Sequence, residues 1–173
     1  MAAYGATIPD LVGPEIRMLL VGINPSLYSG WSGLHFARPG NRLWRTLHES
    51  GLTPRQLRPA ETSELLAAGI GITNLVARAT ARADELSAEE IRAGVAPLRE
   101  LVRRHRRLRA VAFLGISTYR IAFDVRRVVV GEQPGTRFED ARVWVLPNPS
   151  GLNASYQQPA LTAAYAALRR ECD

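Results

Sequence analysis

Four short apolar runs, separated by segments with helical patterns, constrain the fold of this chain most. They are Ile16 to Val21, Gly71 to Val76, Ala110 to Leu114 and Arg142 to Leu146. Short runs of this kind are typical of buried strands, and strands that alternate with helices favour a parallel sheet covered on both faces. We therefore predict an α/β protein in which a three-layer α/β/α domain surrounds a central, mostly parallel sheet. One domain over residues 1–173, with its core at about residues 16–170, is expected.

Helix-start signals lie between these runs. A loop rich in glycine, serine and proline is expected to run from the first strand to Gly40, and a weak β-like stretch is expected at Val128 to Val130. The predicted helices run from Asn41 as N-cap to near Gly51, from Thr53-Pro54, from the capping box Ser87 to Glu90 as far as Val102, through Tyr119 and Phe123, and from Pro159 to Arg170.

Two of the apolar runs end in similar loops. The first run leads into Gly22-Ile23-Asn24-Pro25-Ser26, and the last leads into Asn148-Pro149-Ser150-Gly151-Leu152. Loops that leave the carboxyl ends of strands form the usual ligand edge of an open α/β sheet. Proline restricts φ and so stiffens each loop, while the asparagine amide can hold a water molecule or read the edge of a base. The two loops are therefore predicted to form one site.

The composition excludes several classes of chemistry. The chain has a formal net charge of +6 and contains no lysine, which suits a polyanionic partner and excludes an imine formed through a lysine amine. A cysteine-held zinc or iron–sulfur site is excluded, because the single cysteine, Cys172, cannot supply its several ligands, and we expect no metal or organic cofactor. No run approaches the roughly 20 apolar residues of a membrane span. Without a visible secretory signal, a monomeric protein of the bacterial cytoplasm is expected.

Other charged or glycine-rich features point less clearly to a function. The run Arg103 to Arg107 follows a predicted helix, and a solvated helix end at the opposite edge of the sheet is favoured over a DNA-binding patch. The histidines lack partners at metal-ligand spacing, although His35 lies near the first loop and could line the site. Asp84 precedes a helix start, where acids are common for structural reasons. No G-x-G-x-x-G or G-K-[ST] motif supports a nucleotide-phosphate cradle.

Three segments together resemble the mismatch-specific uracil-DNA glycosylases, the branch of the uracil/thymine-DNA glycosylase superfamily that includes the thymine-DNA glycosylases. Gly22 to Leu27 is similar to that family's Gly-Ile-Asn-Pro-Gly-Leu, and Phe36 to Trp44 to its aromatic and Asn-x-aromatic-Trp stretch. Leu146 to Leu152 is similar to its second motif. The resemblance spans roughly Ile16 to Leu168, with the motifs in the family's order. It implies a uracil-DNA glycosylase-like fold.

The resemblance also implies roles for residues of the first two segments. Asn24 would hold the water that attacks the sugar C1′ once an oxocarbenium-like sugar has formed. Backbone N–H groups near Ile23 and Phe36 would bind the uracil edge. The ring of Phe36 would stack on the flipped base, the alternative being a core aromatic. Ser29 would lie beside the pyrimidine C5, where a small residue leaves room for substituents.

The second motif would contact the duplex. Leu152 would enter the gap left by the flipped nucleotide, and Ser150, Gly151 and Asn153 would lie near the DNA and the orphaned partner base. Asn148 would line the base pocket in the place held by a histidine in the classical enzymes, which predicts slower chemistry.

The chain departs from the family pattern at two positions. Ser26 replaces a glycine, so the pocket floor must differ if that backbone needs a positive φ. Ala154 stands where some members carry a basic wedge residue, which puts strict reading of an opposing guanine in doubt.

The predicted function is that of a monofunctional DNA glycosylase that flips uracil, and related damaged pyrimidines, out of DNA, especially mismatched DNA, in base excision repair. Hydrolysis of the N-glycosidic bond would leave an abasic site. One alternative is a non-catalytic module that binds a flipped base, which would have no reason to retain Asn24. Another is a hydrolase of free nucleosides, which would act on deoxyuridine and would not need Leu152.

Overall fold

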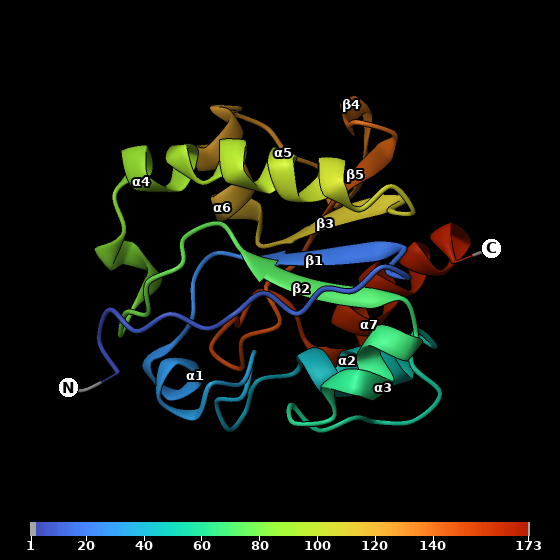
Figure 1. Ribbon diagram of the computed structural model, residues 1–173, viewed down its shortest axis with the longest axis horizontal. Helices are drawn as coiled ribbons and strands as arrows, with labels where there is room; N and C mark the ends of the chain where they lie inside the picture. The colour runs from blue at the N-terminus through green and yellow to red at the C-terminus, as the bar shows by residue number, and fades with distance from the viewer. Residues whose placement is uncertain (1–2, 173) are drawn as a thin grey trace.

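A five-stranded sheet organises the protein, for which a computed structural model describes residues 3–172 (Figure 1). The strands are β1 (Met18–Gly22), β2 (Ile70–Asn74), β3 (Ala110–Leu114), β4 (Gly131–Phe138) and β5 (Ala141–Leu146), in the order β2-β1-β3-β5-β4. Strands β1, β2, β3 and β5 pair in parallel, and β4 pairs with β5 in antiparallel fashion. The predicted mostly parallel sheet is confirmed.

Helices cover both faces of the sheet. Helices α4, α5 and α6 lie on one face, and α2, α3 and α7 lie on the other (Figure 1). The α-helices are α1 (Leu27–Ser32), α2 (Leu43–Glu49), α3 (Thr62–Ala67), α4 (Ala88–Ala93), α5 (Val95–Arg104), α6 (Ile116–Phe123) and α7 (Gln158–Ala166), and two 3₁₀ segments are η1 (Ala83–Glu85) and η2 (Ala167–Glu171). The three-layer α/β/α architecture is therefore confirmed.

Alternating side chains of the central strands form two separate cores. In β1, Leu19 and Val21 pack with residues of α5 and α6, while Met18 and Leu20 pack with residues of α2 and α7. Successive side chains of a strand point to opposite faces, and here both faces are covered. This is why the strand sequences read as continuous apolar runs.

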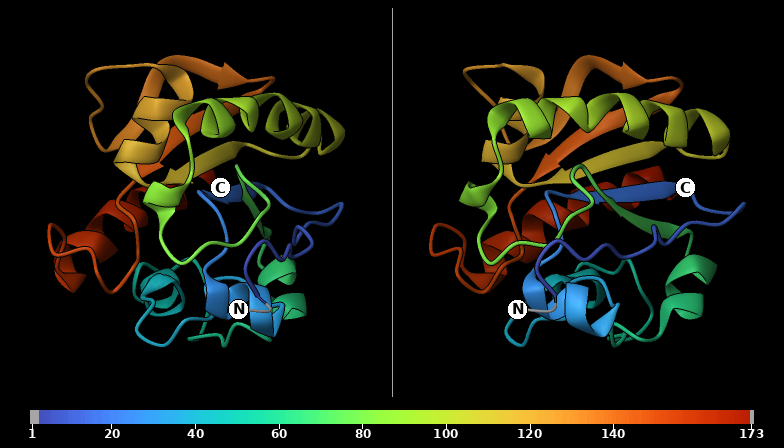
Figure 2. Two further views of the ribbon diagram at one scale, coloured as in Figure 1. Left: turned by 90° about the vertical axis from the view of Figure 1, so that its left-hand side faces the viewer. Right: turned by 60° about the vertical axis from the view of Figure 1, so that its left-hand side comes forward.

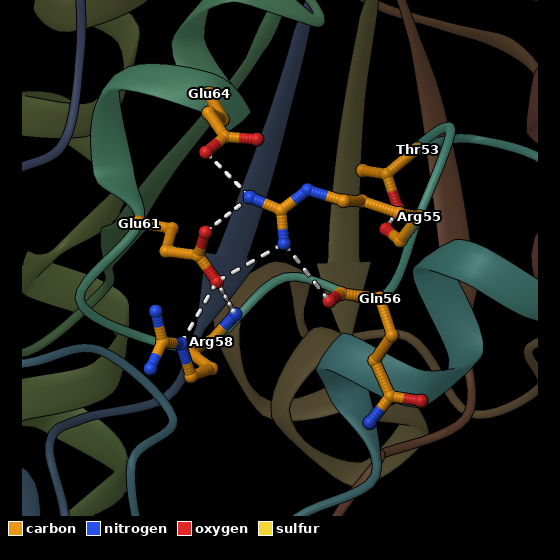
Figure 3. A network of polar contacts seen from close by, with 6 residues as sticks. All are labelled: Thr53, Arg55, Gln56, Arg58, Glu61 and Glu64. Carbon is orange, nitrogen blue, oxygen red and sulfur yellow. Dashed lines mark hydrogen bonds and ion pairs between the residues drawn. The ribbon is translucent and has the colours of Figure 1, made fainter.

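The helix predicted from Thr53-Pro54 is wrong. The Thr53 hydroxyl donates instead to the Arg55 carbonyl at 2.8 Å, and the next helix, α3, starts nine residues later at Thr62. Pro59 explains the failure, because a proline within the first turns removes a helical donor and disfavours helical geometry at the residue before it. The Arg55 guanidinium holds the resulting loop by binding the carboxylates of Glu61 and Glu64 (Figure 3).

The β-like stretch predicted at Val128 to Val130 is also wrong. Val129 is almost fully exposed, and the edge strand β4 begins only at Gly131. This strand contains two glycines with positive φ and a proline, and its pairing with β5 is irregular between Glu132 and Arg137. Such residues weaken strand propensity, so the sequence pattern does not reveal an edge strand there.

Two predicted segments are subdivided. The loop expected up to Gly40 contains α1, and the helix expected from Ser87 to Val102 is split at Gly94 into α4 and α5. A Cβ atom at Gly94 would lie 2.2 Å from the Leu75 carbonyl oxygen, so the helical segment approaches the chain after β2 closely at this point. Within residues 3–172, no helix is long and apolar enough to cross a membrane.

Candidate active site

The two Asn-Pro loops lie together at the carboxyl edge of the sheet, the side that faces the viewer in Figure 2, left. They follow β1 and β5, which are separated in the sheet only by β3. A pocket with a cavity volume of about 160 Å³ lies between them and is lined by residues of both loops, among them Ile23, Asn24, Asn148 and Ser150. This volume is below the roughly 300–1,000 Å³ of pockets for drug-sized ligands, so it suits a smaller group.

The amide of Asn24 is held in one orientation. Its Nδ2 atom donates to the Arg78 carbonyl at 3.0 Å and to the Thr80 hydroxyl at 2.8 Å. Both amide hydrogens are therefore used, and among the described residues no donor reaches its Oδ1 atom. Because the residue lines the pocket, that oxygen is available as an acceptor for a water molecule or ligand.

The segment that anchors Asn24 is itself tied down. Thr80 donates its hydroxyl hydrogen to the Arg82 carbonyl at 2.7 Å and its backbone N–H to the Pro25 carbonyl at 3.2 Å. The Arg78 guanidinium makes two hydrogen bonds to the Glu90 carboxylate, at 2.6 and 3.0 Å, and these hold the pKa of Glu90 below its usual range. The role of Thr80 could not be predicted from the sequence, because no local pattern links this residue to Asn24.

Ser26 adopts a conformation that needs no glycine. Its φ of −70° and ψ of 165° are ordinary extended values, and its hydroxyl accepts the Ser29 N–H at 3.1 Å as the N-cap of α1. The question raised by the missing family glycine is therefore answered: this backbone does not require a positive φ. Ser29, on the first turn of α1, is buried in the pocket wall, where its Oγ accepts the Ala37 N–H at 3.4 Å.

The side chains of Phe36 and Asn74 both lie close to Gly22. A Cβ atom at Gly22 would lie 2.5 Å from Asn74 Oδ1 and 3.1 Å from Phe36 Cζ, so only glycine allows both side chains to occupy this part of the pocket. Phe36 has a positive φ of 49°, and its carbonyl accepts the Trp44 Nε1–H at 3.1 Å. The Asn74 amide, at the end of β2, is a pocket residue that sequence analysis did not single out.

The backbone near the first loop offers further donors. In residues 3–172, the backbone N–H groups of Ile23 and Phe36 have no hydrogen-bond acceptor, while the Ile23 carbonyl accepts the Val76 N–H at 2.9 Å. Both residues line the pocket. These N–H groups could reach a molecule in the pocket, and their roles as donors to a base stay predictions.

The second loop is shaped by its own side chains. Asn148 Oδ1 accepts the Ser150 N–H at 2.9 Å, and Asn153 Nδ2 donates to the Asn148 carbonyl at 3.0 Å. The Asn148 amide oxygen is therefore used locally, and its Nδ2 group is left as the donor that this pocket residue can offer. The buried Tyr165 hydroxyl supports the loop by donating to the Pro147 carbonyl at 2.9 Å, and burial raises the pKa of this phenol.

Arg42 clamps the second loop from the side of α2. Its guanidinium donates to the carbonyls of Tyr156, Ser150 and Asn153 at 2.7, 2.9 and 3.2 Å. Its backbone N–H donates to the Pro149 carbonyl at 2.9 Å. In the sequence Arg42 stands only as part of a motif, and no spacing signal indicates that it closes a loop more than a hundred residues away.

Leu152 projects from this clamped loop. Its side chain is 75% exposed, and its backbone N–H donates to the Ser150 hydroxyl at 3.2 Å. Gly151 packs closely below it, since a Cβ atom there would lie 2.5 Å from the Gly40 carbonyl oxygen. Leu152 lines two grooves, one of about 570 Å³ shared with Asn148 and one of about 270 Å³ shared with Arg38. An exposed leucine on a loop held by several hydrogen bonds has a shape that suits a wedge, and this role stays a prediction.

Of the residues set aside by sequence analysis, only His35 reaches the pocket. It is 7% exposed, and its Nε2–H donates to the Pro9 carbonyl at 2.8 Å in the tautomer that this contact requires. Burial lowers the pKa of His35, so the ring is neutral near pH 7. Asp84 lies outside the pocket in the larger groove, paired with Arg82 at 3.1 Å. Arg103 and Arg104 end α5, the helix leading into β3, and so lie at the opposite edge.

Two comparisons with known proteins bear on this geometry. The family model described as the Uracil DNA glycosylase superfamily matches residues 9–169. A solution NMR structure of a "putative Uracil DNA glycosylase" from Methanosarcina acetivorans is similar in fold, with a TM-score of 0.68 and 20% sequence identity. The similarity covers 96% of this chain and 98% of that one. The match over residues 9–169 shows that the chain belongs to the Uracil DNA glycosylase superfamily.

Proposed function

We propose that this protein is a monofunctional DNA glycosylase that removes uracil, and related damaged pyrimidines, from DNA and prefers mismatched sites. The observation that carries the proposal is the fixed amide of Asn24, whose two N–H groups are bound by Arg78 and Thr80 and whose oxygen remains available in the pocket. Membership of the superfamily supports it.

The proposed reaction begins with cleavage of the C1′–N1 bond. The electron pair of that bond leaves with the base, and the sugar becomes an oxocarbenium-like cation. The free N–H groups of Ile23 and Phe36 and the Asn148 Nδ2 group would stabilise the negative charge on the leaving base. Removal of one such preorganised donor commonly lowers kcat by a factor of about 10²–10³.

A water molecule then adds to C1′, and its proton passes to solvent or to the departing base. Asn24 is not a base, so its proposed role is to hold the water by accepting one of its hydrogens. A cationic sugar needs a well-placed nucleophile more than a strongly deprotonated one. His35, neutral and hydrogen-bonded to Pro9, forms part of the wall and has no step assigned to it.

The exposed Leu152 favours DNA over a free nucleoside as substrate. A nucleoside hydrolase has no base stack to open. Flipping a base from a duplex costs a few kcal/mol in lost stacking and pairing, and an apolar side chain in the vacated gap offsets part of this cost. The net charge of +6 also suits a polyanionic substrate. The preference for mismatches rests on the lower cost of flipping a poorly paired base.

The test uses labelled oligonucleotides with uracil opposite guanine, opposite adenine, or unpaired. After incubation, abasic sites are cleaved with alkali and the products are resolved by length. We expect uracil-dependent cleavage that is faster opposite guanine than opposite adenine. Absence of base release from all three substrates by the folded protein would overturn the proposal.

The product itself provides a second test. Strand cleavage by β-elimination normally proceeds through an imine, and the chain contains no lysine to form one. The abasic strands should therefore stay intact until alkali or heat is applied. Trapping of a protein–DNA adduct with borohydride in substantial yield would contradict a monofunctional reaction.

A further inference from the structure

The geometry points to Arg38 as a binding site for the DNA phosphodiester beside the flipped nucleotide. This inference rests on the proposed function, because it requires a base in the pocket and a wedge in the duplex. Arg38 is the single arginine among the described residues that line the base pocket, and it also lines the smaller groove beside Leu152.

Three residues border both cavities: Arg38, Asn41 and Ser150. The Asn41 side-chain oxygen already accepts the Leu43 N–H at 2.9 Å, and the Ser150 hydroxyl accepts the Leu152 N–H at 3.2 Å. In the part of the chain that the structure describes, no ion pair or hydrogen bond engages the Arg38 guanidinium, and its side chain is exposed. Of the three, Arg38 is therefore the residue with a charge to offer an anion.

The position of Arg38 matches the path that the DNA backbone must follow. If the base enters the pocket and Leu152 fills the vacated space in the stack, the sugar–phosphate chain joining them passes between the two cavities. The residue at that boundary faces a phosphodiester. A guanidinium suits this ligand, since its N–H groups form a planar fork that can bind two phosphate oxygens.

The backbone that carries Arg38 is well supported. The Arg38 carbonyl accepts the Asn41 N–H at 3.0 Å, and the neighbouring Gly40 packs against Gly151 of the second loop. The loop that bears the arginine thus contacts the loop that bears the wedge. Because this loop contacts the loop that carries Leu152, the Arg38 side chain can bind a phosphate at a fixed distance from Leu152.

The experiment measures the salt dependence of DNA binding in the Asn24→Ala background, where the uracil substrate persists. Affinities for a uracil–guanine duplex and for the same duplex without uracil are compared over a range of salt concentrations. The variants are Arg38→Gln, the charge-retaining Arg38→Lys, and Arg104→Gln as the matched control. Arg104 is also exposed, and no hydrogen bond or ion pair engages its guanidinium within residues 3–172, but it ends α5 at the far edge of the sheet.

The slope of log K against log salt concentration is negative, and loss of one phosphate contact makes it less steep by about 0.9. We expect this decrease for Arg38→Gln on the uracil duplex, with a loss of affinity of roughly tenfold at low salt, as for a hydrogen bond to a charged group. The decrease should be smaller on the undamaged duplex. Arg38→Lys should retain the slope, and Arg104→Gln should behave like the parent protein.

The outcomes separate the two proposals. If the wild-type protein releases uracil but Arg38→Gln keeps the full salt slope, the phosphate site is wrong and the proposed function stands. A slower single-turnover rate with an unchanged slope would assign Arg38 to the leaving base and would equally overturn the site. If the wild-type protein releases no uracil, the proposed function fails regardless of the slope. Equal losses in Arg38→Gln and Arg104→Gln would indicate general charge and would also overturn the inference.

Discussion

The two Asn-Pro loops have similar sequences but different exposures and anchors. In the first loop, Asn24 is half-buried and its amide is tied to a segment more than fifty residues away. In the second loop, Leu152 stands 75% exposed on a backbone clamped by Arg42. The first arrangement fixes the direction of one polar group, and the second presents an apolar one to solvent. We infer that Asn24 of the first loop serves the reaction and that Leu152 of the second loop serves access to the base, while Asn148 at the start of the second loop contributes a donor to the leaving base.

The largest expected effect comes from Asn24→Ala, which removes the proposed water-holding amide. We predict that base release falls on the order of 10²-fold or more in single-turnover assays, while DNA affinity changes little, because positioning a nucleophile contributes mainly at the transition state. Asn148→Ala, which removes a proposed donor to the leaving base, should also lower base release on duplex and single strands alike. Turnover like that of the wild type in Asn24→Ala would remove this residue from the mechanism.

Leu152→Ala tests the proposed wedge in the second loop. If the side chain is a wedge, uracil removal from duplex DNA should lose roughly 1–3 kcal/mol of transition-state stabilisation, the scale of a lost apolar contact and part of the unstacking cost. Removal from single strands should be nearly unchanged. Because the side chain is exposed, the melting temperature should not change. Val129→Ala, at an equally exposed valine, is the control, and a fall in both activities would refute the wedge.

Thr80→Val asks whether the anchor of Asn24 matters. The substitution removes the hydroxyl that accepts from Asn24 Nδ2 at 2.8 Å while keeping the volume of the side chain. A net hydrogen bond is worth about 1 kcal/mol, so we expect base release to fall roughly fivefold on duplex and single strands alike. Thr80→Ser, which keeps the hydroxyl, should restore most of the rate. Equal rates for the valine and serine variants would show that the amide needs no anchor.

The smallest expected effect is a loss of hydrogen-exchange protection in the first loop at low pH. The pKa of Glu90 is lowered by its hydrogen bonds to Arg78, so this contact stabilises the folded state above the unfolded pKa and is lost as pH falls through the lower folded value. Below about pH 4.5, the exchange protection of the Thr80 N–H should therefore fall before that of residues in the second loop, whose clamp by Arg42 to carbonyls does not titrate there.

The control for this prediction is Glu90→Gln. It should show the lower protection already at neutral pH and little further change on acidification. If both loops lose protection together at the same pH in the wild-type protein, the ion pair does not hold the first loop separately.

Features carried by local patterns could be predicted from the sequence. The strands β1, β3 and β5 are short apolar runs, and the asparagines of both loops follow directly after two of them. The edge strand β4 and the loop after Thr53 could not be predicted in the same way. In β4 the pairing overrides the weak propensity of its glycines and proline, and after Thr53 a proline and a cluster of ion pairs replace the expected helix.

The supports of the site depend on contacts between distant parts of the chain. Asn24 and Thr80 are 56 residues apart, and Arg42 and Tyr156 are 114 apart. Residues such as these have no fixed spacing, so a single sequence holds no signal for their pairing. Most of the side chains proposed to contact the substrate belong to motifs that can be recognised in the sequence. The side chains that orient them can be identified only from the folded structure.

The most direct test of the division between the two loops is the ratio of duplex to single-strand rates of uracil release, measured by single turnover for the wild type, Asn24→Ala and Leu152→Ala. Asn24→Ala should lower both rates and leave the ratio unchanged, since both substrates need the same water. Leu152→Ala should lower the ratio and leave the single-strand rate intact. The same ratio in all three proteins, or an altered ratio in Asn24→Ala alone, would contradict the account.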